Sequence, residues 1–262
     1  MKTTTRLTIL GLSILSIILL MACAPASEMS EISAPAAEGD PQVISDTHLT
    51  GEPGELSDQE INHLLYMREE EKLARDVYLA MADLWGMNIF SNIANSEATH
   101  MAAVKDLLDF YSLDDPADNT ANGVFTNPDL QTLYDDLVAT GSQSLAEALQ
   151  VGAAIEEIDI LDLEIALSQT DEEAILIVFE NLARGSRNHL RSFTRVYERQ
   201  TGLSYEPQFM ENIDYQLIIN AESETNGNRS SQGNQIDAGR GKRNNPDNLG
   251  GRNQRWNQTN ND

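Results

Sequence analysis

Four carboxylates and two histidines in this chain have the residue types and the spacing of metal ligands. Glu97 and His100 stand three residues apart in the stretch NSEATHMAAV, and Glu156 and Asp159 repeat that interval. Residues three apart lie on the same face of a helix, so each pair would point in one direction. The full set of candidate ligands is Glu71, Glu97, His100, Glu156, Asp159 and His189.

These six residues interrupt apolar stripes that we expect to face the core. Steps of three and four residues around Glu97 and His100 give the series Phe90, Ile93, Val104, Leu107 and Tyr111. Similar series run through the three other long helical segments, each with its polar residues near the middle. The candidate ligands of four helices should therefore meet at one depth inside the domain.

Other acidic residues nearby fall beside these stripes. Glu69 and Glu70 flank the stripe that carries Glu71, and we expect both to be solvated. We expect the same of three acidic residues on the third long helix, namely Glu157, Asp162 and Glu164. A small shift of register in that helix would exchange Glu157 for Glu156.

Burial of four carboxylates requires a counter-charge. An unpaired ion costs several kcal/mol to bury, and two imidazoles cannot neutralise four carboxylates. Two divalent metal ions would. Because sulfur is missing from the ligand set, iron or manganese fits better than structural zinc, which is usually closed by cysteine. The alternatives are a core histidine bonded to a neighbour, and a Glu71 paired with Lys72 or Arg75.

Helix start and stop signals predict an all-α fold between residues 57 and 201. Capping boxes, with a hydroxyl residue followed three places later by Glu, begin at Ser57, Ser144 and Thr170. Another long helix should run from about Asn88 to Leu113. A short helix should open at Pro128 after the cap Asn127 and close at Gly141.

The two ends of the chain differ in composition from this helical region. Residues 1–22 have a basic start and an apolar run, as in a signal peptide, and LLMAC before the spacer resembles a bacterial lipobox. This predicts lipid attachment at Cys23, with an uncleaved membrane anchor as the alternative. We expect a flexible spacer at 23–56, a folded domain at 57–220 and a disordered Asn/Gly/Arg-rich tail at 221–262.

The predicted lipid anchor implies a cell-envelope lipoprotein that faces the periplasm. Ala24 and Pro25 follow Cys23, with no aspartate, which favours the outer membrane over the inner. The single cysteine excludes an internal disulfide and a thiolate metal cluster in this chain. The net charge of −25 argues against a nucleic-acid partner, which would need a basic face.

The order of the candidate ligands is that of ferritin-like di-metal bundles. A lone carboxylate on one helix and Glu-x-x-His on the next is the ligand pattern of that architecture. Glu71 precedes His100 by 29 residues, and Asp159 precedes His189 by 30. This near-equal spacing predicts two helical hairpins related by a pseudo-twofold axis, each supplying half of a site.

Three stretches resemble a known family. EKLARDVYLAMA from Glu71, IANSEATHMAAVKDLL from Ile93 and GSRNHLRSF from Gly185 are similar to the ferritin-like superfamily, of which the rubrerythrins are the best-known group. Within it, they most resemble the uncharacterised family called domain of unknown function 2202. The resemblance extends over about residues 57 to 215. It implies a four-helix bundle with a short extra helix between helices two and three.

The resemblance also implies two iron ions, or iron and manganese, and chemistry with oxygen, peroxide or ferrous iron. It assigns one half of the site to Glu71, Glu97 and His100, and the other half to Glu156, Asp159 and His189. Ser186 departs from the pattern, because it stands where the last helix would carry a bridging glutamate. Glu156 could take the place of that missing carboxylate.

Two tyrosines and a row of arginines could assist such a site. Tyr78 and Tyr111 lie on the stripes and could hydrogen-bond ligands or pass electrons, although core packing is the alternative role. Arginines at steps of three and four on the last helix would pair with acidic faces of neighbouring helices or of a second copy in a homodimer. They are Arg184, Arg187, Arg191, Arg195 and Arg199.

Three functions remain open from the sequence. The first is redox catalysis with peroxide, oxygen or ferrous iron, which would need an external electron donor because the chain lacks the cysteines of a rubredoxin-type centre. The second is a lipoprotein that binds or handles metal without catalysis. The third is a metal-free helical module for interaction with other proteins, in which the buried carboxylates would have no energetic explanation.

Overall fold

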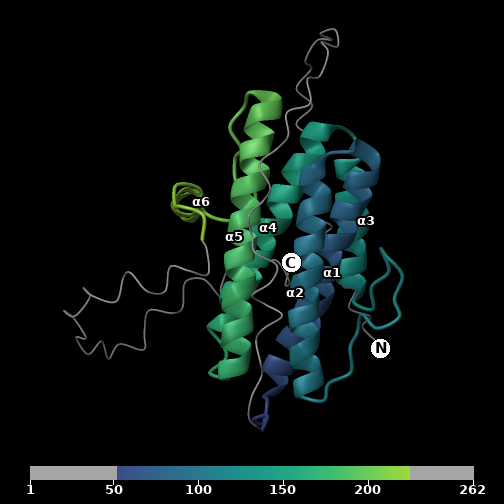
Figure 1. Cartoon of the computed structure of the whole chain (residues 1–262), viewed down its shortest axis with the longest axis vertical. Helices are drawn as coiled ribbons and strands as arrows, with labels where there is room; N and C mark the ends of the chain where they lie inside the picture. Colours follow the sequence, from purple (N-terminus) through teal and green to yellow (C-terminus); the bar gives the residue numbers. More distant parts are fainter. Residues whose placement is uncertain (1–51, 225–262) are drawn as a thin grey trace, which may run out of the picture. The chain divides into compact units, whose positions relative to one another are not determined.

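The computed structural model describes residues 52–224, and all the regular structure in that range is helical (Figure 1). The predicted all-α class is thereby confirmed. The predicted signal peptide, Cys23 and nearly all of the predicted spacer and tail lie outside the described residues. Within them, no helix combines the length and the apolar character needed to cross a membrane.

Four long helices and two short ones make up the described region. The helices are α1 (Asp58–Trp85), α2 (Asn88–Phe110), α3 (Pro128–Gly141), α4 (Leu145–Leu167), α5 (Glu173–Thr201) and α6 (Asn212–Ile219). The predicted short helix in the connection between the second and third long helices is α3. The last helix, α6, was not predicted, because its sequence has no cap signal and is only 8 residues long.

Most of the predicted helix starts are confirmed. Ser57 and Glu60 form the complete capping box of α1. Ser144 accepts a hydrogen bond from the backbone of Glu147 at the start of α4, and the Asn127 side chain caps α3. These bonds satisfy backbone N–H groups that have no partner inside the helix.

The start of α5 and the end of α2 differ from the prediction. The Thr170 hydroxyl donates to Glu60 at 2.6 Å and accepts from the Glu172 backbone at 3.1 Å. Thr170 therefore joins the starts of α5 and α1, and α5 begins later, after the N-cap Glu172. The helix α2 ends at Phe110, because Ser112 adopts a left-handed conformation with φ of 56°.

The long helices pack in two pairs that meet each other. One pair is α1 with α2, and the other is α4 with α5. The pairs are joined by contacts of α1 with α4 and of α2 with α5, so each long helix touches two others. The short α3 packs on α1 and α4, and α6 packs on α5.

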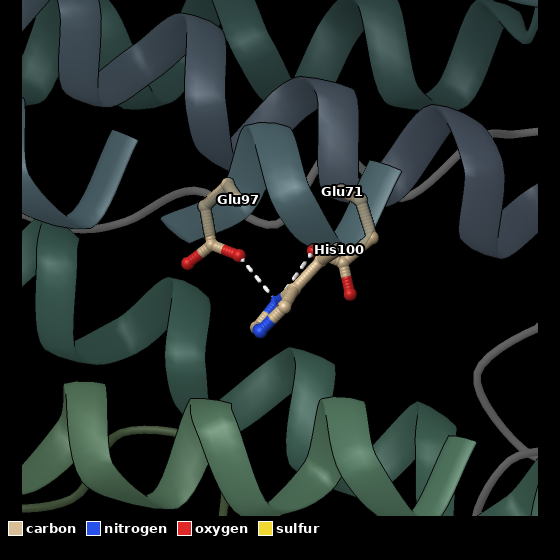
Figure 2. Close-up of side chains that lie close together, drawn as sticks. All are labelled: Glu71, Glu97 and His100. Atoms are coloured by element: carbon tan, nitrogen blue, oxygen red, sulfur yellow. Dashed lines mark hydrogen bonds and ion pairs between the residues drawn. The ribbon is translucent and has the colours of Figure 1, made fainter. Parts of the chain in front are cut away.

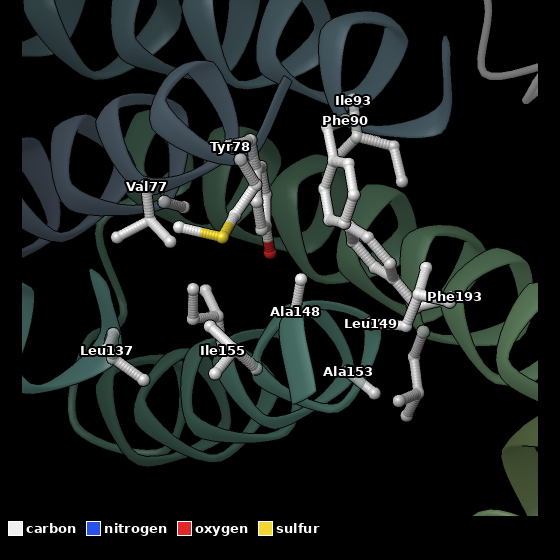
Figure 3. Packing of buried hydrophobic residues seen from close by; sticks show 14 of the residues in the cluster. Val77, Tyr78, Phe90, Ile93, Leu137, Ala148, Leu149, Ala153, Ile155 and Phe193 are labelled. Carbon is white, nitrogen blue, oxygen red and sulfur yellow. The ribbon is translucent and has the colours of Figure 1, made fainter. Parts of the chain in front are cut away.

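The hydrophobic core consists of two clusters. The first, which we call the Phe193 cluster, includes Tyr78, Phe90, Leu149 and Phe193 (Figure 3). The second, the Phe179 cluster, includes Leu64, Leu107, Leu163 and Phe179. In α2, the Phe193 cluster ends at Ala94 and the Phe179 cluster begins at Ala103. The polar residues Glu97 and His100 lie between, and α1 and α5 repeat this arrangement. In α4 the polar residues lie at the end of the Phe193 cluster, just before its member Ile160.

Candidate metal centre

One group of potential ligands comes from the α1–α2 pair. The Nδ1 atom of His100 lies 2.7 Å from Glu97 Oε2 and 3.2 Å from Glu71 Oε2 (Figure 2). All three side chains are buried, and each offers a ligand atom within 4.8 Å of the others. Two carboxylates and one imidazole thus converge on a single point.

A second group joins α2 to the α4–α5 pair. The Nδ1 atom of His189 lies 2.8 Å from Glu97 Oε1 and 3.5 Å from Glu156 Oε2. Its members Glu97, Glu156 and His189 are all buried and offer ligand atoms within 4.8 Å of one another. Glu97 belongs to both groups, with one oxygen towards each histidine. The rings of His100 and His189 stack with centroids 5.5 Å apart.

Asp159 and Ser186 lie together in the same buried layer. The Ser186 hydroxyl donates a short hydrogen bond to Asp159 Oδ2. The other oxygen of Asp159 is buried without a hydrogen bond among the described residues. Ser186 replaces the expected bridging glutamate, and the carboxylate beside it is that of Asp159. Glu156, which could substitute for that glutamate, has its Oε2 atom 3.5 Å from His189 Nδ1.

The two predicted tyrosines have different surroundings. The hydroxyl of Tyr78 donates to Glu156 Oε1 at 2.5 Å and is fully buried. The hydroxyl of Tyr111 instead donates to Glu172, just before α5 begins. From there to His189 is nearly five turns of helix, or about 25 Å. Tyr78 contacts the ligand layer, whereas Tyr111 does not.

The unsatisfied atoms of this layer are all of ligand type. Glu97 Oε1 and His189 Nδ1 lie 2.8 Å apart and make no other hydrogen bond, so they pair with each other only while the histidine is protonated. Glu71 Oε1 and Asp159 Oδ1 are buried and have no hydrogen bond at all within the described part of the chain. Such atoms are rare in folded proteins and need a partner. The donor set and these open atoms together fit a pair of divalent metal ions.

Electrostatics in the first group favour a protonated histidine beside a carboxylate. Burial raises the pKa of Glu71 well above its usual value; the charge of Asp159 raises it further, and His100 lowers it only in part. Burial would lower the pKa of His100, but Glu71 and Glu97 outweigh it and raise that pKa well above its usual value. The proton on His100 therefore occupies the position that a cation would take.

In the second group, too, the neighbouring carboxylates favour a protonated histidine. Burial opposes ionisation of His189, but Glu97 and Glu156 raise its pKa to about 10. Burial would also raise the pKa of Glu97, yet the two histidines lower it below the usual value. Burial and the charge of Glu156 raise the pKa of Asp159 to about 7. Protons thus hold this centre together when no metal is bound.

Two residues that the sequence did not single out position the histidine rings. The Nε2 atom of His189 lies 3.0 Å from the Ser96 hydroxyl, which holds the ring with Nδ1 towards the centre. Gly185 leaves room for His100, because a Cβ at that position would lie 2.5 Å from His100 Nε2. Ser96 directly precedes Glu97, and Gly185 directly precedes Ser186, but no general pattern would have identified either.

Three acidic residues that were expected to be solvated are buried. Glu69 accepts hydrogen bonds from the backbone and hydroxyl of Thr126 in the connection before α3. Glu157 is fully buried and accepts bonds from the segment before α6. Glu70 is only 4% exposed. These predictions were wrong because the stripe argument assigns each helix a single buried face, whereas α1 and α4 are covered on several sides.

Two other acidic residues were also expected to be solvated, and for them the structure agrees better with the prediction. Glu164 is exposed and Asp162 is half-buried. Both lie on α4, beyond Asp159 along the helix. The register chosen for that helix therefore holds, with Glu156 rather than Glu157 in the second group.

Comparison with known proteins places the chain in a family. Residues 60–222 match the family model described as an uncharacterised protein domain, DUF2202. The uncharacterised protein MJ0754 of Methanocaldococcus jannaschii is 49% identical over 174 residues, covering 66% of this chain and 94% of the relative. The crystal structure of hypothetical protein MJ0754 from the same archaeon has a TM-score of 0.64 at 48% identity, and covers 67% of this chain and 100% of that one. The chain belongs to the DUF2202 family.

Proposed function

We propose that this protein is a ferritin-like four-helix bundle that binds two iron ions, or iron and manganese, and uses them in redox chemistry with peroxide, oxygen or ferrous iron. The observation that carries the proposal is Glu97, whose two oxygens face histidines from two different helices. A carboxylate in that position can bridge two ions. The pairwise contacts of the four long helices support the bundle.

In the proposed centre, His100 and Glu71 would hold one ion and His189 and Glu156 would hold the other, with Glu97 available to both. Asp159 lies beside Ser186 as a further ligand. Iron would supply electrons by changing between its ferrous and ferric states.

The chain's own residues then fix geometry and manage protons. The Tyr78 hydroxyl holds Glu156 Oε1, which leaves the other oxygen towards His189. Ser96 fixes the His189 ring through its outer nitrogen. Before metal binds, Asp159 has a pKa of about 7 and can therefore release a proton near neutral pH as an ion enters. The Phe193 and Phe179 clusters keep bulk water away from both sides of the layer.

Metal binding without catalysis is a second candidate, and Ser186 favours it. A serine cannot supply the bridging carboxylate expected at this position, so the centre has one carboxylate fewer on α5. With a single cysteine, the chain also lacks a thiolate-bound iron centre that could pass electrons to the site. Turnover would need an external reductant, or ferrous iron as the electron source.

We propose further that Cys23 is lipidated and that the protein is a lipoprotein of the cell envelope, on the outer membrane rather than the inner. The lipobox-like LLMAC and the apolar run before it support this. Mass spectrometry of the protein purified from membranes would show a diacylated N-terminal cysteine. A Cys23→Ser variant found in the same membrane fraction as the wild type would contradict the proposal.

The function is tested by metal content and reactivity. The protein is loaded anaerobically with ferrous iron, freed of excess metal, analysed for iron, and then mixed with peroxide while its absorption is recorded. We expect about two ions per chain and rapid oxidation of the bound iron, as in carboxylate-bridged di-iron bundles. Glu71→Gln should retain about one ion, and Glu97→Gln should retain almost none.

Glu164→Gln is the matched control, because Glu164 is an exposed glutamate on α4 and should leave loading unchanged. Two bound ions without oxidation by peroxide or oxygen would favour metal handling over catalysis. If Glu97→Gln bound as much iron as the wild type, the proposed centre would be wrong.

A further inference from the structure

Glu70 is a buried carboxylate that the proposed centre does not use. It lies on α1 directly before Glu71 and is 4% exposed. Neither of its oxygens accepts a hydrogen bond from an N–H or hydroxyl group among residues 52–224, and both are inaccessible to solvent. The group in hydrogen-bond contact with Glu70 is another carboxyl, that of Asp162. Other buried carboxylates of the described region, such as Glu69 and Glu157, have N–H or hydroxyl donors. The Glu70–Asp162 pair therefore needs a shared proton or a cation between its oxygens.

The groups around Glu70 are acidic as well. It faces the carboxyl of Asp162 on α4, with Asp159 and Glu71 also close enough to act on it. Burial and these three like charges raise the pKa of Glu70 well above its usual value. No basic side chain is among its main electrostatic neighbours. A cation among Glu70, Asp162, Asp159 and Glu71 would reduce the repulsion between these four carboxylates.

These carboxylates form a path from the surface to the centre. Asp162 is half-buried, and the half-buried Tyr66 and His63 lie near it. Asp159 and Asp162 stand three residues apart and so share one face of α4. The series of carboxylates runs from the half-buried Asp162 through the buried Glu70 to Glu71 and Asp159. Each step is between carboxylates, which suit hard divalent cations.

We propose that Glu70 and Asp162 form a transit site through which divalent cations pass between solvent and the two-metal centre. The inference rests on the proposed function and extends it to the route of metal entry. The open carboxylate of Glu70 offers two oxygens without tying them to any N–H or hydroxyl donor of the described residues. A cation held there by Glu70, Asp162 and water is bound weakly enough to move on to Glu71 and Asp159.

The test is the rate of metal uptake and release, with Co²⁺ as a probe that does not react with air. Absorption of bound Co²⁺ is followed after rapid mixing, and release is followed after addition of excess chelator. Glu70→Gln and Asp162→Asn should each slow uptake and release by tenfold or more. Because a transit site changes both rates alike, the affinity of the centre and the final content of about two ions should stay the same.

Glu164→Gln, an exposed carboxylate two residues from Asp162 on α4, controls for the loss of one negative charge. It should load at the wild-type rate. Glu71→Gln provides the opposite pattern, because removing a ligand should lower affinity and stoichiometry. Circular dichroism and melting temperature establish that each variant is folded. If Glu70→Gln fails to fold, Asp162→Asn alone decides the question.

The outcomes separate this inference from the proposed function. If the wild-type protein binds no Co²⁺ or iron at its centre, the proposed function fails and the transit site with it. If the wild type loads two ions while both variants load and release at wild-type rates, the centre stands and the transit site is refuted. In that case the partner of Glu70 is a proton, shared with Asp162.

Discussion

The carboxylate of Glu97 pairs with two histidines on different helices, His100 on α2 and His189 on α5. In the metal-free protein each imidazole carries a proton and pairs with a Glu97 oxygen. The pKa of His189 is raised to about 10, so this histidine is protonated at neutral pH. A metal ion, by contrast, needs the neutral ring. Metal and proton therefore compete for the same nitrogen.

Metal affinity should consequently rise with pH. Between about pH 6 and 9, below the raised pKa of His189, each bound ion must displace a proton, and affinity should increase about tenfold per pH unit for each proton released. Calorimetry of Co²⁺ binding in buffers of different ionisation enthalpy would count the protons. An affinity independent of pH over this range would mean that the histidines are not ligands.

Replacing Gly185 should displace the ring of His100. A Gly185→Ala change places a Cβ 2.5 Å from His100 Nε2 and should push the ring away from Glu71 and Glu97. The change also raises helix propensity by about 1 kcal/mol, so overall stability should fall little. Iron content should drop from about two ions to about one.

Gly152→Ala is the matched comparison for that variant. Its added Cβ would collide with the ring of Phe193 rather than with a candidate ligand. We expect a lower melting temperature with unchanged metal content per folded chain. If both alanine variants lost metal equally, the effect would be one of general packing.

At the scale of elements, one carboxylate holds the segment between α5 and α6 in place. Glu157 on α4 accepts bonds from the backbone of Gln208, Phe209 and Met210 at 2.7–2.9 Å. The Tyr205 hydroxyl adds another at 2.6 Å. These residues form the segment that leads into α6, and α6 packs on α5.

Glu157→Gln should therefore loosen this segment. The amide has one acceptor oxygen and no charge, and loss of charge-assisted hydrogen bonds should cost about 2–3 kcal/mol. Hydrogen exchange would show faster exchange at the amides of residues 208–210, with little change in α1 and α2. Unchanged protection there would show that the apolar contacts of α6 suffice to hold it.

Helical periodicity identified the residues of the candidate centre, but it did not predict which of the acidic residues around the centre are buried. Glu97 and His100 were found because they interrupt an apolar stripe at positions that must face the core of a long helix. Glu157 was missed because its donors come from residues 205–210, a segment without periodicity. Glu70 was missed because α1 contacts α2, α3 and α4, and a helix covered on several sides has no single buried stripe.

Helix ends were predicted where local bonds decide them. Ser57 and Asn127 act within their own first turn, so their roles can be read from neighbouring residues. Thr170 donates to Glu60, which is 110 residues away in the chain. No local signal contains that contact, and the start of α5 was accordingly placed too early.

At the scale of the whole molecule, negative charges greatly outnumber positive ones. The chain has 42 acidic and 17 basic residues, a net charge of −25. Charge of one sign repels itself in the folded state. It also concentrates cations near the surface, where the proposed transit site opens.

Salt should therefore stabilise the metal-free protein. The Debye length falls from about 30 Å at 0.01 M to about 10 Å at 0.1 M ionic strength, which screens much of the repulsion. We expect the melting temperature to rise by about 2–4 °C per kcal/mol gained. Scanning calorimetry in sodium chloride, with chelator present to exclude metal, would measure it. A fall in melting temperature would show that favourable ion pairs outweigh the repulsion.

The shared position of Glu97 also bears on how the molecule comes apart. Glu71, Glu97 and His100 all belong to the α1–α2 pair, so an ion there ties together only neighbouring helices. An ion between Glu97 and His189 joins that pair to α4–α5, across about 90 residues of sequence. It would act as a removable cross-link, and its loss would let the two hairpins open as separate units while the first ion still held its own hairpin closed.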